Sequence, residues 1–287
     1  FAPISGGLVP CSDGAGEVVA VGSQVQGLAV GDRVATLFFP HWQSGKPDAR
    51  ALSDARGAES AGAFTEHFVS DERGLIKLPD GLSYAEGATL PCAAVTAWNS
   101  LFEAGDLKPG QTVLLLGTGG VSIFALQFAK AAGAKVIITS SDDAKLERAR
   151  VLGADHGINY RRHPEWHEEV LRLTGGQGVD VVLEVGGPGT LERSLMSVAT
   201  GGRIAYIGVL TGLAGAANPV MLIPKASSIQ GIFVGSRAMF ADMLAAIQTH
   251  VIHPVIDREF AFADAPAALE YMKSGSHFGK VVVRVGD

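Results

Sequence analysis

A run of glycines between two apolar segments is the part of this sequence with the clearest chemistry. It follows the apolar run Val113–Leu116 and leads into a segment with helical spacing. A strand, a glycine turn and a helix in this order direct backbone N–H groups toward a pyrophosphate. Gly117 permits a tight turn and Gly119 permits close approach of phosphates, whereas Ser122 replaces the third glycine of the usual fingerprint. We therefore predict a dinucleotide site, and its residues at the turn are Gly117, Thr118, Gly119, Gly120, Val121 and Ser122.

The choice between the two nicotinamide cofactors depends on the end of the next predicted strand. A site for NAD places Asp or Glu about 20 residues past the glycines, but this chain has Ser140 and Ser141 there. Their hydroxyls can donate hydrogen bonds to a 2′-phosphate, and Lys145 lies within one helical turn, although it could equally be an exposed helix lysine. Asp142 and Asp143 argue the other way, but they also suit the first residues of a helix. We predict a preference for NADP(H) over NAD(H).

Strands alternate with helices from Val113 to Gly235, which predicts a doubly wound parallel sheet. Apolar residues follow the ends of the later strands, where such sheets bind ligands. These residues could line a cofactor site or simply pack in the core, and they are Val185, Ile207, Val209, Ile232 and Val234. The predicted strands are Val113–Leu116, Lys135–Thr139, His156–Asn159, Val179–Val185, Arg203–Val209 and Ile229–Gly235.

Outside this region the pattern is that of an antiparallel, barrel-like domain with short strands and tight turns. The stretch from His41 to Gly62 is polar and aperiodic, which is typical of a mobile loop, and Asp264–Met272 reads as a capped helix. The remaining predicted strands are Gly16–Gly22, Val30–Val34, Ala63–Val69, Leu75–Gly81 and Gly279–Val285.

Composition excludes several classes of function. The net charge of −6 gives no basic surface for nucleic acid, and no apolar run reaches the roughly 20 residues that cross a bilayer. Two distant cysteines, Cys11 and Cys92, do not indicate a disulfide framework. We expect a cytoplasmic protein. No signal peptide is visible, although the chain begins at Phe1 without a methionine.

Five segments together carry a family resemblance: Gly16–Gly22, Gly31–Val34, Leu90–Trp98, Gly117–Val121 and Gly279–Val282. The chain resembles the medium-chain dehydrogenase/reductase superfamily, and within it the zinc-independent quinone oxidoreductase-like and alcohol dehydrogenase-like branch. This implies a GroES-like substrate domain over 1–95, a Rossmann dinucleotide-binding domain over 96–235, and a return to the substrate domain over 236–287. The family begins with strands not found before Phe1, so the first part of the barrel is expected to be missing.

The resemblance also implies roles for single residues. Thr96 matches a residue that lines the nicotinamide. Lys145 and Tyr160 match a Lys and a Tyr that lie against the 2′-phosphate in quinone-reductase-like relatives. Lys280 matches a basic position that contacts the pyrophosphate, although it could be a surface lysine of the last strand.

A catalytic zinc needs three protein ligands and one open position, and the resemblance indicates that they are lacking. Zinc-dependent relatives have Gly-His-Glu where this chain has Cys11-Ser12-Asp13, so the histidine position holds Ser12, a poor ligand. Cys92 stands at a zinc-ligand position, but it also suits a small buried hydrophobic residue. Cys11 with Asp13 could in principle replace the lost ligand. The loop that matches the structural zinc lobe has no cysteine. We therefore predict no metal and place Ser12, Asp13 and Cys92 in the substrate pocket.

The resulting prediction is an NADPH-dependent reductase of a small quinone or enone, because these reactions need no strong proton acceptor. An alcohol or aldehyde dehydrogenase of the same superfamily and a non-catalytic NADP(H)-binding protein stay open as alternatives. The segment Ile229–Val234 would form an apolar sheet edge, which invites pairing unless it is covered. We therefore predict a homodimer, with the alternative that Asn218–Pro224 covers this edge within one chain.

Overall fold

The protein is described from a computed structural model in which residues 7–286 are placed. The described residues form two compact units. Unit 1 comprises residues 7–95 and 234–286, and unit 2 comprises residues 96–233. Within the described residues, no helix has the length and apolar character needed to cross a membrane.

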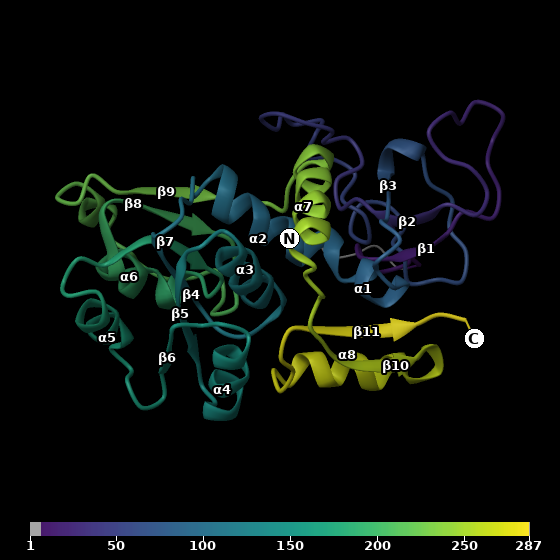
Figure 1. The fold of residues 1–287 in the computed structure, drawn as a ribbon. Helices are drawn as coiled ribbons and strands as arrows, with labels where there is room; N and C mark the ends of the chain where they lie inside the picture. Colours follow the sequence, from purple (N-terminus) through teal and green to yellow (C-terminus); the bar gives the residue numbers. More distant parts are fainter. Residues whose placement is uncertain (1–6, 287) are drawn as a thin grey trace. The chain divides into compact units, whose positions relative to one another are not determined.

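Unit 2 is built on a six-stranded parallel sheet with the order β6-β5-β4-β7-β8-β9 (Figure 1). The chain starts in the middle at β4, moves outward to β6, and then returns to continue from β7 to β9. The order therefore reverses between β4 and β7, which confirms the predicted doubly wound sheet. The strands are β4 (Thr112–Leu115), β5 (Lys135–Ser140), β6 (His156–Asn159), β7 (Val179–Glu184), β8 (Val198–Tyr206) and β9 (Ser228–Gly231).

Helices cover this sheet because its central strands are apolar on both faces. After their first residues, β4 and β5 are almost fully buried, with Leu114 and Val136 at 0% exposure. The face that carries Leu114 packs against Trp166 and Leu195 of two helices that follow β6 and β7. The helices of unit 2 are α3 (Gly120–Ala131), α4 (Asp143–Val151), α5 (Trp166–Leu173) and α6 (Pro188–Ser197), with the short turn η4 (Pro219–Leu222) and the π-helical turn η3 (Asn99–Glu103).

Unit 1 contains a three-stranded antiparallel sheet and a separate two-stranded sheet. In the first, β1 (Ala15–Glu17) pairs with β2 (Arg33–Thr36), which pairs with β3 (Leu75–Lys77). In the second, β10 (Ile256–Ala261) and β11 (Lys280–Arg284) run parallel, joined through α8 (Ala265–Lys273). The parallel pair differs from the antiparallel pattern expected for this region, because α8 reverses the chain direction between the two strands.

The remaining helical elements lie in or at the edge of unit 1. Helix α7 begins at Arg237, where Ser236 accepts a hydrogen bond from the N–H of Met239 and so caps the first turn. These elements are α1 (Tyr84–Ala88), η1 (Glu72–Gly74), η2 (Leu90–Ala94), α2 (Val95–Trp98), α7 (Arg237–His250) and η5 (Phe262–Asp264).

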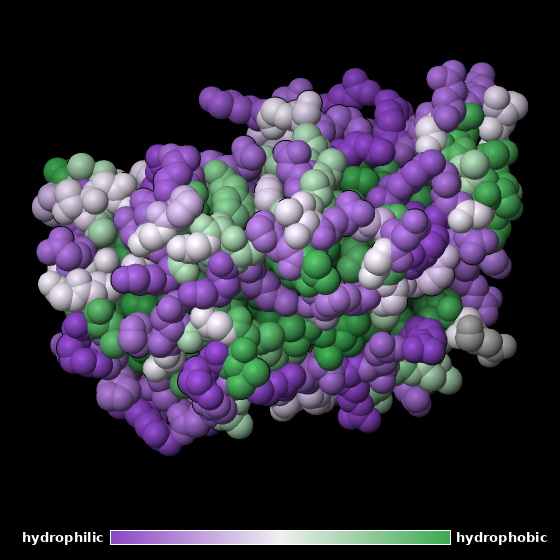
Figure 2. Space-filling view, in the orientation of Figure 1, coloured by the Kyte–Doolittle hydropathy of each residue, from purple (hydrophilic) through white to green (hydrophobic). Residues whose placement is uncertain are grey.

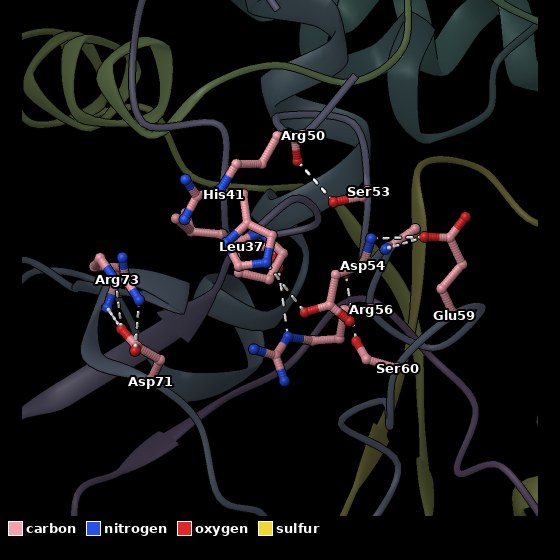
Figure 3. A network of polar contacts seen from close by, with 12 residues as sticks. Leu37, His41, Arg50, Ser53, Asp54, Arg56, Glu59, Ser60, Asp71 and Arg73 are labelled. Atoms are coloured by element: carbon pink, nitrogen blue, oxygen red, sulfur yellow. Dashed lines mark hydrogen bonds and ion pairs between the residues drawn. The ribbon is translucent and has the colours of Figure 1, made fainter. Parts of the chain in front are cut away.

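The loop over residues 41–62, predicted to be mobile, has neither helix nor strand but holds an ordered set of polar contacts (Figure 3). Arg56 is 6% exposed and donates to the carbonyl of Leu37 at 3.4 Å. The carboxylate of Glu59 accepts from the N–H of Asp54 at 2.6 Å. A buried guanidinium needs acceptors, so Arg56 ties this loop to the end of β2.

Residues 63–69 were predicted as a strand but form an irregular segment. The alternation of apolar and polar residues there predicted one buried face. Instead Val69 is 99% exposed, so no sheet neighbour covers that face.

Figure 2 shows a mainly hydrophilic face of the molecule, with smaller groups of hydrophobic residues among the polar ones.

Candidate functional site

The glycine turn at the carboxyl end of β4 has the geometry of an anion site. Gly117 has φ +72°, a left-handed conformation that favours glycine, and its N–H donates to the hydroxyl of Thr139 at 3.1 Å. Gly119 is the N-cap residue of α3 and provides no side-chain cap. A Cβ at either glycine would meet no atom of residues 7–286 within 4 Å, its own chain neighbours apart. The space above the turn is therefore open, and a pyrophosphate fits against the first N–H groups of α3.

Ser122 explains how the turn functions without a third glycine. Its side chain is 1% exposed, and its hydroxyl donates to the carbonyl of Leu116 at 2.7 Å. This hydrogen bond joins the first turn of α3 to the end of β4, where a glycine would only have allowed close packing. Thr118 is buried beside it, and Gly120 and Val121 are half-buried at the start of α3.

The end of β5 carries the residues predicted to select the cofactor. Ser140 is 3% exposed and its hydroxyl accepts from the N–H of Asp142 at 3.3 Å, whereas Ser141 is half-buried. The carboxylate of Asp142 accepts from the N–H groups of Ala144 at 2.7 Å and Lys145 at 3.1 Å. Asp142 therefore caps helix α4, which is one of the two roles that the sequence suggested for it.

The second aspartate is occupied by donors from the segment after β6. Asp143 accepts from the side-chain amide of Asn159 at 2.8 Å and forms an ion pair with Arg162. Tyr160 is 41% exposed, and its N–H donates to the carbonyl of Ser140. The structure thus brings Tyr160 to the end of β5, near the start of α4. Sequence reasoning missed Arg162, although two arginines directly after Tyr160 are a visible signal.

The remaining predicted residues of unit 2 lie after the later strands or near its start. Val185 and Ile207 are half-buried beyond β7 and β8, and Ile207 packs with Ile232, which is 7% exposed. Val209 is 39% exposed. Thr96 is 2% exposed, and its carbonyl accepts from the hydroxyl of a serine one helical turn later.

In unit 1 an ion pair joins the two ends of the described chain. The Lys280 ammonium lies 3.0 Å from one carboxylate oxygen of Asp13, and the Ser12 hydroxyl donates to the other at 2.8 Å. The side chains of Asp13 and Lys280 are 13% and 21% exposed. Burial alone would lower the pKa of Lys280, but the Asp13 carboxylate, with smaller effects of the Cys92 and Cys11 thiols, raises it.

The backbone around this pair is strained and enclosed. Cys11 has φ +76°, a conformation that costs a non-glycine residue about 1–3 kcal/mol, and it stands where the zinc-dependent relatives have a glycine. The N–H groups of Gly62 and Ala63 donate to the carbonyls of Val9 and Cys11 at 2.7 and 2.8 Å. A Cβ at Gly57 would lie 2.7 Å from the Cys11 backbone. The loop over residues 41–62 therefore packs directly on the Cys11–Asp13 segment.

The side chains around Asp13 do not suit a zinc ion. The Cys11 thiol donates to the Asp13 carbonyl at 3.3 Å. Cys11 is an exposed residue, but loss of water around its thiol, followed by the Asp13 carboxylate, raises the pKa of that thiol and so disfavours the thiolate that metals need. Lys280 places a cation on the Asp13 carboxylate, and Cys92 is half-buried in η2. Among residues 7–286, no group of three His, Cys, Asp or Glu side chains has the arrangement of a metal site.

Unit 1 also contains the predicted residue Val234 and a surface hollow. Val234 is 5% exposed with φ +57°, an unusual conformation for a β-branched residue. A hollow of about 640 Å³ lies between β3 and α7, and Ile76 and Leu244 form part of its wall. The predicted site residues of unit 1 do not line it.

Comparisons with known proteins place these features in a family. Residues 2–80 match the alcohol dehydrogenase GroES-like domain, and residues 120–249 match the zinc-binding dehydrogenase family. A zinc-type alcohol dehydrogenase-like protein of Schizosaccharomyces pombe is 46% identical over 99% of this chain and 84% of its own length. A quinone oxidoreductase of Pseudomonas aeruginosa is 33% identical over 90% of this chain and 76% of its own.

A solved structure agrees with these sequence matches. The crystal structure of a NAD-dependent alcohol dehydrogenase is 33% identical, covers 99% of this chain and 84% of its own, and superposes with a TM-score of 0.88. The shared domains, the parallel sheet and the open glycine turn all indicate the same protein family. The chain is an oxidoreductase that belongs to the medium-chain dehydrogenase/reductase superfamily.

Proposed function

We propose that the protein is an NADPH-dependent reductase of small quinones or enones. The observation that carries this proposal is the open glycine turn together with a serine-lined end of β5. When bound, the cofactor supplies the hydride. The chain supplies backbone N–H groups at Gly119 and Gly120 for the pyrophosphate, and unit 1 would supply the substrate pocket with Ser12, Asp13 and Cys92.

The preference for NADPH rests on charge at the end of β5. The two carboxylates that would repel a 2′-phosphate already accept hydrogen bonds, Asp142 from the start of α4 and Asp143 from Asn159 and Arg162. Lys145, in the first turn of α4, adds a positive charge there. A similar solved structure is that of a NAD-dependent alcohol dehydrogenase, so the cofactor preference of this chain needs a direct test.

A zinc-independent reaction is part of the proposal. The Lys280 ammonium on Asp13 supports it, because a cation beside the carboxylate opposes binding of a metal ion there. Metal analysis of the purified protein is expected to find no stoichiometric zinc, and a chelator should leave activity unchanged. One tightly bound zinc per chain, lost together with activity on chelation, would contradict this part.

Alcohol or aldehyde oxidation is the second candidate, and one observation favours it. Taking a proton from an alcohol without zinc needs an acceptor, and the Ser12 hydroxyl joined to the Asp13 carboxylate at 2.8 Å could pass a proton to that carboxylate. The same contact is also compatible with quinone or enone reduction, so measured activity must decide between the two candidate functions.

The deciding experiment is a substrate panel. NADPH oxidation is measured with quinones, enones and aldehydes, and NADP⁺ reduction is measured with alcohols. Turnover of quinones or enones at the highest kcat/KM supports the proposal. Turnover of alcohols and aldehydes alone favours the second candidate. NADPH binding without turnover of any member would indicate a binding protein and contradict both.

We further propose a homodimer formed along β9. This strand is the edge of the six-stranded sheet, with Ile229 39% exposed and Phe233 beyond it 48% exposed. The alternative cover, η4, instead turns Met221 and Leu222 toward the core beside α6. Light scattering is expected to give twice the chain mass of 29.7 kDa. A monomer mass at all concentrations tested would overturn the dimer.

A further inference from the structure

Glu184, the last residue of β7, is a fully buried carboxylate at the carboxyl edge of the sheet, with 0% exposure. One of its oxygens accepts from the N–H groups of Gly186 at 2.8 Å and Gly187 at 2.9 Å and from the Thr190 hydroxyl at 2.6 Å. The other accepts from the Ser194 hydroxyl. All four partners are neutral groups, and none of them is a cation. The carboxylate is thus held by neutral dipoles.

Part of its role is structural, because Glu184 lies at the start of helix α6. At the other end of this helix the Lys225 ammonium donates to the carbonyls of Leu195, Met196 and Val198 at 3.0, 2.7 and 2.8 Å. A negative group at the N-terminus and a positive group at the C-terminus both stabilise a helix. Hydrogen bonding alone, however, does not require a charge. A glutamine could accept the same three bonds and donate to the serine hydroxyl.

The position of Glu184 indicates why a charge is present. Leu183 of β7 pairs with Leu115, the last residue of β4. Glu184 therefore comes one residue beyond this pair, level with the segment that leads from β4 into the glycine turn at Gly117. It therefore lies at the point where the strand order reverses. In doubly wound folds a dinucleotide spans this point, with one nucleotide on each half of the sheet. In the proposed function the end of β5 binds the adenosine half of the cofactor. The half of the sheet that begins with β7 then binds the nicotinamide half.

The field of this carboxylate reaches its neighbours. Tyr206 of β8 pairs with Glu184 in the sheet register. Burial, followed by the Glu184 charge, raises the pKa of Tyr206. A buried charge acts over longer distances than one in water because the protein interior screens it weakly. A cationic ring bound near the end of β7 would be stabilised in the same way.

We propose that the Glu184 carboxylate stabilises the oxidised, cationic nicotinamide relative to the reduced, neutral ring. This inference rests on the proposed function, and it adds a direction to it. Binding NADP⁺ more tightly relative to NADPH makes hydride donation from the bound reduced cofactor more favourable. The residue acts by its charge through space, so it selects the redox state of the cofactor rather than the substrate.

The test measures the dissociation constants of NADP⁺ and NADPH separately for the wild type and for Glu184→Gln. The ratio of the NADP⁺ constant to the NADPH constant is expected to rise about fivefold in the variant, the size of one partly screened charge interaction. A loss of shape alone would weaken both cofactors equally and leave the ratio unchanged. An unchanged ratio in a folded variant that binds both cofactors would overturn the proposal.

Two control variants separate charge from structure. Ser194→Ala removes one hydrogen bond and keeps the carboxylate, and Lys225→Met removes the charge at the far end of α6. Both are expected to lower stability while the ratio stays at the wild-type value. A ratio that rises equally in either control would count against a specific role of Glu184.

A second replacement covers failure of the glutamine variant to fold. Glu184→Met combined with Ser194→Ala replaces the carboxylate and its hydroxyl partner with apolar atoms, and the same ratio is measured with the same expectation. The proposed function fails separately, because a wild-type protein that binds neither NADP⁺ nor NADPH would refute that function before any variant is compared.

Discussion

The glycine turn of unit 2 and the Asp13–Lys280 pair of unit 1 are assembled in opposite ways. The turn uses consecutive residues, and its functional groups are mainly backbone N–H groups at the start of α3. The pair uses two side chains 267 positions apart, enclosed by a loop that is itself irregular. The turn is therefore defined by local conformation, whereas the pair exists only when unit 1 has folded.

This difference separates the two kinds of consequence that a substitution can have. Around the turn there is open space, so a small added group should affect a ligand more than the protein. Around Asp13 the charged groups are largely buried, so removing one partner should affect the protein itself. Substitutions in the two regions test this contrast.

Lys280→Met is expected to lower the free energy of unfolding of unit 1 by about 2–3 kcal/mol, because it leaves the Asp13 carboxylate buried and unpaired. Urea denaturation measures this loss. Because the pKa of Lys280 is raised in the folded protein, the contribution of the pair is complete below about pH 10.4, the pKa of an unfolded lysine, and is lost as pH rises through the folded pKa.

The matched control for this prediction is the double variant Asp13→Asn with Lys280→Met. Removing both charges should restore much of the stability, since no buried charge is left alone. The single variant Asp13→Asn completes the cycle. If the double variant loses as much stability as Asp13→Asn and Lys280→Met together, the two side chains are not coupled and the contrast between the units is lost.

Gly119→Ala is expected to weaken NADPH binding by about thirtyfold, equivalent to about 2 kcal/mol of overpacking against a phosphate. Stability should change by less than about 0.5 kcal/mol, because φ is −79° and the added Cβ comes within 4 Å of no described residue beyond its chain neighbours. Fluorescence titration and thermal unfolding measure the two effects. Gly22→Ala, with equally open space in unit 1, is the control and should change neither. A stability loss at Gly119 without weaker binding would break the contrast.

The same contrast explains what could be predicted from the sequence. The parallel sheet follows from apolar runs and helical spacing that are local, and the predicted start of β5 at Lys135 and both ends of β6 agree with the structure. The single-residue expectation that Asp142 caps a helix is confirmed for the same reason. The roles of these residues toward a cofactor stay predictions.

Long-range features of unit 1 could not be read in this way. The alternation in Ala63–Val69 predicted a strand, but a strand needs a partner, and local pattern does not specify one. Lys280 was expected to contact a pyrophosphate or solvent, and its contact with Asp13 depends on the parallel pairing of β10 with β11. The buried Arg56 was missed because its acceptors come from distant segments.

Lys145→Ala is expected to weaken NADPH binding by about 1–2 kcal/mol, the value of one partly exposed charged hydrogen bond, and to leave NADH nearly unchanged. Parallel titrations with the two cofactors measure this difference. Lys135→Ala removes an equally positive side chain at the opposite end of β5 and should affect neither cofactor. Equal losses for NADPH and NADH at Lys145, or tighter NADH binding by the wild type, would refute the predicted preference.

The smallest effect concerns backbone conformation, which should follow the same local rule in both units. Val251 follows α7 with φ +51° and is 72% exposed. Val151 ends α4 in a helical conformation and is 74% exposed. Val251→Gly is expected to stabilise unit 1 by about 1 kcal/mol, because a β-branched residue is strained in the left-handed region that glycine prefers. Val151→Gly should instead destabilise unit 2 by about 0.3–0.5 kcal/mol, because glycine is a poorer helix former than valine. Thermal unfolding of both variants compares the same substitution at equal exposure, so shifts of the same sign would show that local backbone geometry does not control either position.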